Sequence, residues 1–94
     1  MKNFKDTYNK EIDRLKQFIP IVSRVHGKSH NEFYEVEQEF NKIVSKIDLG
    51  NYNLDNEFNN LKVITNNYEI PNDTCETYEY VYKKLKLLND RYGD

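Results

Sequence analysis

Six consecutive residues decide how this chain folds: Val25-His26-Gly27-Lys28-Ser29-His30. They contain both histidines of the protein and the first of its three glycines. An apolar stripe with helical spacing ends at His26, and a pattern typical of a helix start opens at Ser29. Because glycine commonly follows the last residue of a helix, the stretch is predicted to be the turn between two helices.

The segment before this turn is predicted to form one long helix over residues 2–26. Its apolar residues recur at steps of three and four, which places them on one helical face. They are Phe4, Tyr8, Ile12, Leu15, Ile19, Val22 and His26. Pro20 lies inside this pattern, and a proline in a helix removes one hydrogen bond and crowds the preceding turn. Since the stripe keeps its phase across Pro20, we predict a kinked helix, or two helices in line, rather than a loop.

Three further amphipathic segments follow the turn, and helices are predicted at residues 30–47, 52–67 and 72–92. Each has an apolar face with helical spacing that is expected to point to the core. In the first, these residues are Phe33, Val36, Phe40, Ile43, Val44 and Ile47; in the second, Leu54, Phe58, Leu61, Ile64 or Thr65, and Tyr68; in the third, Cys75, Tyr78, Val81, Tyr82, Leu85, Leu88 and Tyr92.

The predicted ends of these helices depend on short local patterns. Ser29-x-x-Glu32 and Asp73-x-x-Glu76 have the spacing of capping boxes. The segment Asp48-Leu49-Gly50-Asn51 is a break, and Pro71 suits the first turn of the last helix. Four amphipathic helices with short connections predict an all-α fold, an up-down bundle in a single domain of residues 1–94.

The composition of the chain limits which classes of partner and which cellular compartment are expected. The 14 basic and 16 acidic residues give a net charge of −2 and are interleaved, so no basic stripe indicates a nucleic acid. The apolar runs are far shorter than a membrane span requires. One cysteine excludes an internal disulfide, and a signal-peptide pattern is missing. We therefore expect a cytoplasmic protein that binds neither nucleic acid nor membrane.

Both histidines are candidate metal ligands. His26 falls on the core face, where it could either cap a backbone carbonyl or project into the bundle as a ligand, as iron ligands in helical bundles do. His30 follows four residues later, but Gly27 interrupts the helix between them, and a metal-binding pair at that spacing needs a continuous helix. We therefore expect His30 to be exposed to solvent, away from the helical face of His26.

Cys75 has two interpretations. At the start of a helix its thiol could be reactive, because a helix N-terminus favours the thiolate, or it could be a small buried hydrophobe, which we favour. The glutamates of the second helix are expected to form a solvated face: Glu32, Glu35, Glu37 and Glu39. No nucleophile–base set, phosphate loop or Cys-x-x-Cys motif is present in the sequence. We therefore expect a protein that is not an enzyme.

Two stretches resemble the iron–sulfur cluster repair (RIC) proteins, which are hemerythrin-like di-iron proteins. Ile19-Pro20-x-Val22-x-x-Val25-His26-Gly27-x-x-His30-Asn31-x-Phe33 is similar to the family's P-x-V-x-x-V-H-G-x-x-H-P-x-L. Leu61-x-x-Ile64-Thr65-x-x-Tyr68-x-x-Pro71-x-x-x-Cys75-x-Thr77 is similar to its L-T-x-x-Y-x-P-P-x-x-A-C-x-T-W, and Tyr82-x-x-Leu85-x-x-Leu88 fits its last helix. The resemblance implies a truncated hemerythrin-like bundle in which His26 matches an iron-ligating histidine.

The chain departs from this family at most of the iron ligands. An H-x-x-x-E motif of the family would fall near Gly50, and its E-x-x-H-D segment meets Asn51-Tyr52-Asn53-Leu54. The family's last H-x-x-x-E would begin beyond Asp94, and Asn31 stands where the family has proline. The resemblance therefore implies the scaffold without an intact di-iron site, and no cofactor is expected in a single chain.

Three hypotheses about function follow. The first is a small RIC-like helical protein, not catalytic, that acts through protein contacts in stress response or iron–sulfur maintenance. The second is a metal-binding protein whose iron or zinc site is assembled between the chains of a homodimer, with His26 and His30 each present twice beside a glutamate of the second helix. The third is a bundle with a structural or partner-binding role and no relation to that family. We expect a protein partner or a homo-oligomer.

Overall fold

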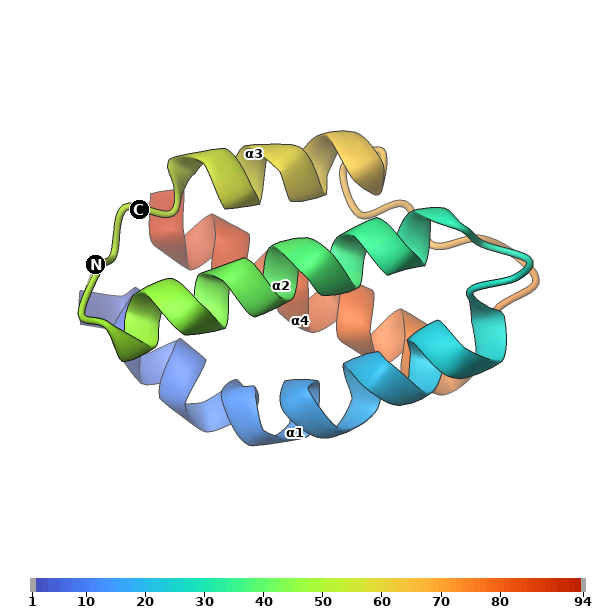
Figure 1. Cartoon of the computed structure of the whole chain (residues 1–94), viewed down its shortest axis with the longest axis horizontal. Helices are drawn as coiled ribbons and strands as arrows, with labels where there is room; N and C mark the ends of the chain where they lie inside the picture. The colour runs from blue at the N-terminus through green and yellow to red at the C-terminus, as the bar shows by residue number, and fades with distance from the viewer. Residues whose placement is uncertain (1, 94) are drawn as a thin grey trace.

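The computed structural model describes the backbone of residues 2–93 and the side chains of residues 4–93. It has four helices, and the described residues form no β-strand. The helices are α1 (Lys2–His26), α2 (Glu32–Asp48), α3 (Asp55–Ile64) and α4 (Glu76–Gly93). Successive helices run in opposite directions, with α1 against α2 and α4, and α2 against α3 (Figure 1). The predicted all-α, up-down bundle is confirmed.

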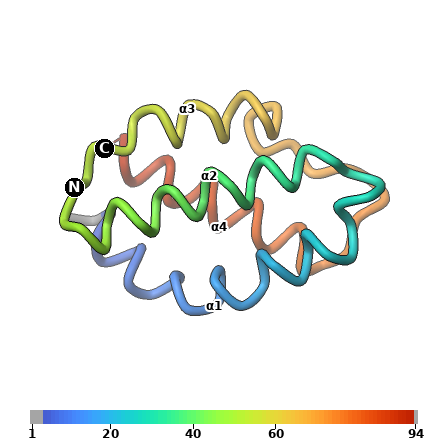
Figure 2. The backbone as a smooth tube through the Cα atoms, in the orientation of Figure 1, coloured from blue at the N-terminus to red at the C-terminus, as the bar shows by residue number. Residues whose placement is uncertain are grey.

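Helix α1 passes through Pro20 as one helix. Figure 2 shows that it bows along its length. Ile19 and Val22, on either side of the proline, are both buried, whereas Pro20 itself is exposed. Packing on both sides of Pro20 thus offsets the missing backbone hydrogen bond. The structure has one continuous helix here, and the alternative of two helices in line is wrong.

The core is apolar and lies between all four helices. Nearly all of the positions predicted to face inward are buried or partly buried. The buried apolar residues are Phe4, Tyr8, Leu15, Ile19, Val22, Phe33, Val36, Phe40, Ile43, Leu54, Phe58, Leu61, Tyr68, Tyr78, Val81, Tyr82, Leu85 and Leu88. Aromatic rings are a large share of this core, so its packing is directional as well as hydrophobic.

The predicted start of α2 is wrong, because its capping box does not form. The helix begins at Glu32, two residues later than expected, and the preceding Asn31 makes no side-chain cap. The Glu32 carboxylate points instead to His30, with Oε1 at 3.3 Å from Nδ1 of that ring. A side-chain contact between two residues of the same turn has thus replaced the predicted cap.

The predicted start of α4 is also wrong, because its capping box does not form either. The Thr74 hydroxyl donates to the carbonyl of Pro71 at 2.9 Å, which holds this segment in a turn, and the helix begins only at Glu76. The carboxylate of Asp73 lies against His30 rather than capping the helix. Cys75 therefore precedes the helix instead of lying in its first turn, and it is exposed rather than buried.

Helix α3 is shorter at its start than predicted because Tyr92 holds the preceding segment. The Tyr92 hydroxyl accepts a hydrogen bond from the backbone N–H of Leu54 at 2.8 Å and lies 3.2 Å from the carbonyl oxygen of Tyr52. The side chain of Asn51 accepts from the N–H of Asn53 at 2.9 Å. These contacts hold residues 51–54 outside the helix, which starts at Asp55.

The other end of α3 is also shorter than predicted. Asn66, Asn67 and Tyr68 have φ values of 52°, 59° and 62°, which end the helix. Asparagine tolerates this left-handed region, but it is unusual for a bulky tyrosine. Tyr68 is held there because Thr65 Oγ1 accepts its backbone N–H at 2.8 Å and its buried hydroxyl accepts from Asn89 at 2.8 Å.

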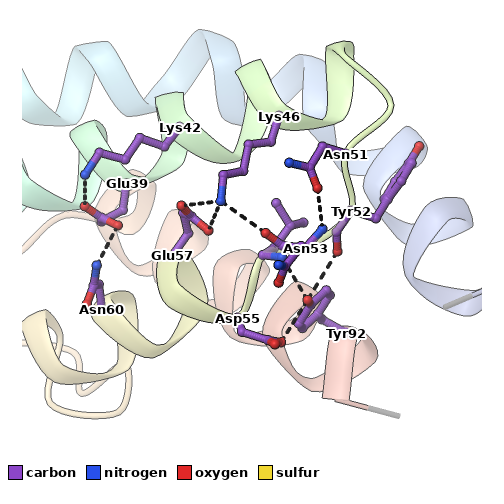
Figure 3. Close-up of polar contacts among 11 residues, drawn as sticks. Glu39, Lys42, Lys46, Asn51, Tyr52, Asn53, Asp55, Glu57, Asn60 and Tyr92 are labelled. Carbon is purple, nitrogen blue, oxygen red and sulfur yellow. Dashed lines mark hydrogen bonds and ion pairs between the residues drawn. The ribbon is translucent and has the colours of Figure 1, made fainter.

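Two glutamates lie in the α2–α3 interface, and one of them corrects a prediction. Glu39 was expected on the solvated face of α2, but it is buried. It accepts hydrogen bonds from Lys42 and Asn60, each at 3.0 Å (Figure 3). The second, Glu57 of α3, is also buried, and Lys46 makes contacts of 2.9 and 3.1 Å with its two carboxylate oxygens.

Replacement of Lys46 by methionine is expected to destabilise the protein by about 1–3 kcal/mol, because it leaves the Glu57 carboxylate buried without its cation. The matched control is Lys42→Met. Glu39 keeps its hydrogen bond from Asn60 in that variant, so the expected loss is under about 1 kcal/mol. Urea unfolding followed by circular dichroism measures both variants. Equal losses of stability in the two variants would show that the Lys46–Glu57 contact contributes no more than the Lys42–Glu39 contact.

Candidate functional site

The turn after α1 and the loop before α4 meet at one end of the bundle (Figure 1). Six side chains that carry or position polar chemistry come together there, and we refer to them as the terminal cluster. They are His26, His30, Glu32, Asp73, Cys75 and Tyr78. They come from α1, the turn, α2, the α3–α4 loop and α4.

One contact in the terminal cluster joins a thiol to an imidazole, those of Cys75 and His26. Nε2 of His26 lies 3.2 Å from the sulfur of Cys75, within hydrogen-bonding distance. When Nε2 carries no proton, the thiol is the donor. Cys75 is exposed, so the sulfur is accessible from solvent while it contacts the imidazole.

His30 faces two carboxylates. Its Nδ1 lies 3.3 Å from Glu32 Oε1, and its Nε2 lies 3.0 Å from Asp73 Oδ1. The side chain is only 15% exposed, so the prediction that it lies in solvent is wrong. The turn folds back far enough for the N–H of His30 to donate to the carbonyl of His26 at 2.8 Å, and this brings the ring under the start of α4.

Tyr78 forms the floor of the terminal cluster. Its ring is fully buried, and its centroid lies 5.4 Å from that of His26 and 5.6 Å from that of His30. Its hydroxyl lies 3.1 Å from that of Tyr82 and donates to Glu32 at 3.4 Å. Burial, and then the hydrogen bond with Tyr82, raise the pKa of Tyr78 far above that of free tyrosine, so its hydroxyl stays protonated in this position.

Gly27 allows the turn to pass close to α1. A Cβ atom at this position would lie 2.4 Å from the carbonyl oxygen of Ser23 and 2.3 Å from Cζ of Tyr34. The first of these atoms belongs to the backbone and cannot move without shifting the helix. Glycine is therefore required for steric reasons where the chain leaves α1 and carries His30 towards His26.

The structure brings both predicted site residues into one cluster, although they do not share a helical face. The His26 and His30 rings are 6.4 Å apart, centroid to centroid. Among the described residues, no three His, Cys, Asp or Glu side chains are arranged to hold a metal ion. Cys75 was singled out from the sequence, but its pairing with His26 was missed, as was the contact of Asp73 with His30.

A shallow pocket of about 420 Å³ lies beside the terminal cluster. Glu32 and Tyr82 form the part of its wall next to the cluster, and the left-handed segment after α3 contributes Asn66. The pocket is open to solvent and its wall is partly polar, so it extends the accessible surface around Glu32 rather than enclosing a ligand.

Comparison with protein-family models, with curated proteins and with solved structures finds no match to this chain. None of the described helices is long and apolar enough to cross a membrane.

Proposed function

We propose that this chain is a small RIC-like helical protein that is not catalytic, holds no di-iron centre within a single copy and acts through protein contacts in stress response or iron–sulfur maintenance. The observation that supports the proposal is the content of the bundle interior. A di-iron centre needs several carboxylate and imidazole ligands that converge between the helices. The interior is instead packed with side chains such as Phe33, Phe40 and Phe58.

The two buried glutamates also support this proposal. Glu39 of α2 and Glu57 of α3 are the buried carboxylates among the described residues. Each is bound by a lysine, Lys42 and Lys46 respectively, within about a hydrogen-bond length. A lysine ammonium at that distance opposes a second cation on the same carboxylate, because like charges repel strongly in a partly buried site.

Metal analysis together with solution mass tests this proposal. The untagged protein is purified from cells grown with added iron, and we expect much less than one iron per chain. A content of about two irons per chain, in a protein with the mass of a monomer, would contradict the proposal.

A candidate surface for the proposed protein contacts lies on α1. Ile21 and Val25 lie one turn apart on this helix and are 37% and 64% exposed. A photo-crosslinking residue placed at position 25 in cells is expected to capture a defined partner. The matched control is position 63, where Val63 is 81% exposed on α3. Identical capture patterns at both positions would contradict a specific contact surface at Val25.

A metal site shared between two copies is a second candidate, and the His26–Cys75 distance favours it. Bond lengths of about 2.3 Å to sulfur and 2.0–2.1 Å to nitrogen place two ligands of a tetrahedral zinc about 3.6 Å apart. The observed separation of 3.2 Å is close to that value. Two copies related by a two-fold axis would supply two cysteines and two histidines, a common zinc ligand set. His30 takes no part, since both of its nitrogens face carboxylates.

The second candidate predicts that added zinc raises the solution mass from monomer to dimer with one zinc per two chains. His26→Ala is expected to abolish both zinc binding and dimer formation, and His30→Ala is the matched control that keeps them. A chain that stays monomeric when zinc is added would remove this candidate.

A further inference from the structure

Cys75 is the single cysteine of the chain and combines access with a neighbouring base. Its side chain is exposed, and its sulfur lies 3.2 Å from Nε2 of His26. We propose that Cys75 is a thiol–disulfide exchange site, at which a low-molecular-weight disulfide forms a mixed disulfide with the chain and His26 takes up the thiol proton. This inference is independent of the proposed function, because it requires neither a partner protein nor a metal.

The imidazole matters because a thiolate, not a thiol, attacks a disulfide. A free cysteine ionises near pH 8.5, so only about 3% of it is thiolate at pH 7. An imidazole nitrogen within hydrogen-bonding distance can accept the proton as the sulfur attacks. The pairing of a thiol with such a base is the usual means of activating a cysteine nucleophile.

The position of His26 is fixed by its neighbours. Its ring meets Tyr78 edge to face, at 5.4 Å and 87°, and Tyr78 is fully buried. His26 is also the last residue of α1, so the helix restrains its backbone while Tyr78 restrains its ring. A base held in place in this way loses little conformational freedom when it contacts the sulfur.

The helix N-terminus and the neighbouring glutamates act on the Cys75 thiol in opposite directions, so His26 is the group that activates it. Cys75 precedes α4, whose first N–H groups favour negative charge, and its own carbonyl accepts the N–H of Glu79 at 3.1 Å. The first turn of α4 also contains Glu76 and Glu79, whose charges oppose that effect. The other imidazole, His30, faces Glu32 and Asp73 rather than the sulfur.

The exchange step is balanced without any further oxidant. The Cys75 proton moves to Nε2 of His26 while the sulfur attacks one sulfur of the disulfide. A new S–S bond forms to the chain, the S–S bond of the disulfide breaks, and the departing thiolate takes the proton back from the imidazolium. Cys75 is oxidised to the mixed-disulfide level, and half of the disulfide is reduced and leaves as a thiol.

The product persists because the chain has no second cysteine to resolve it. An external thiol is needed to restore Cys75, so the site undergoes reversible modification rather than turnover. The single cysteine also limits the product to one adduct per chain, which makes the stoichiometry unambiguous.

The test measures how fast the reduced full-length protein reacts with an aromatic disulfide probe and with glutathione disulfide, with a chelator present to remove metal. The first reaction is followed by absorbance of the released thiolate and the second by intact mass. The expected result is a single adduct at Cys75, formed about tenfold faster in wild type than in His26→Ala. Cys75→Ser is expected to give no adduct.

Two controls separate the base from a structural role. Ser29→Ala changes an exposed side chain of the same turn but leaves the His26–Cys75 contact, and its rate is expected to stay within about twofold of wild type. His26→Gln keeps a hydrogen-bonding side chain that is not a base, and its rate is expected to fall as in His26→Ala. Circular dichroism verifies that each variant is folded. A wild-type rate in His26→Gln, or a folded wild type that reacts no faster than the urea-unfolded chain, would overturn the proposal.

Discussion

Replacement of Phe33 by alanine is expected to lower the free energy of unfolding by about 3–5 kcal/mol. Phe33 is fully buried, and its ring lies 5.1 Å from that of Tyr78 and 6.1 Å from that of Tyr82, nearly parallel to the latter. The variant loses the transfer free energy of the ring, leaves a cavity and removes two aromatic contacts. A domain of 94 residues has a total stability of about 5–14 kcal/mol, so this loss is a large part of the whole.

Urea unfolding monitored by circular dichroism measures the effect of Phe33→Ala. The matched control is Phe33→Leu, which keeps most of the volume and is expected to cost under about 2 kcal/mol. A loss below about 1 kcal/mol in the alanine variant would mean that the aromatic cluster beneath the terminal cluster is not closely packed.

The protein is expected to lose stability steeply between pH 10 and pH 12. Burial raises the pKa of Tyr8 to about 12 and that of Tyr68 to about 12. Burial also raises the pKa values of Tyr78, Tyr82 and Tyr92. In the unfolded chain, tyrosines ionise near pH 10. The folded state therefore binds more protons than the unfolded state above pH 10, and the free energy of unfolding falls as the pH rises.

The sign of this dependence defines the test. The raised tyrosine pKa values contribute to the free energy of unfolding. This contribution is fully present below pH 10 and is lost as the pH passes through about 12. Urea midpoints at a series of pH values are compared with the tyrosinate absorbance. Tyr8→Phe is the matched variant, because it removes one of these groups and is expected to make the decline shallower. A constant midpoint across this pH range would contradict the prediction.

Most of the fold could be predicted from the apolar stripes of the helices, because a spacing of three and four residues can be read from the local sequence. Helix α1 has the bounds that its stripe and Gly27 predict. The ends of α3 and α4 could not be predicted in the same way. The Tyr92 hydroxyl holds Leu54, and His30 holds Asp73, so contacts between distant parts of the chain decide where these helices begin.

The candidate site was only partly predictable for a related reason. His26, His30 and Cys75 were recognised by residue type, but spacing along the chain does not say which loops meet. The up-down order contained the missing signal. In a bundle of this kind, the turn between the first two helices and the loop between the last two lie at the same end, so Cys75 could have been placed near His26 once four helices were predicted.

The place where α1 begins and α4 ends gives a practical advantage. The start of α1 and the end of α4 lie at the end of the bundle opposite the terminal cluster, along the 35 Å axis of the molecule (Figure 1). A fluorophore, an affinity handle or a surface tether attached there would leave Cys75 and His26 facing the surrounding solution. Immobilised protein can therefore be exposed to one thiol-reactive reagent after another without the attachment shielding the site.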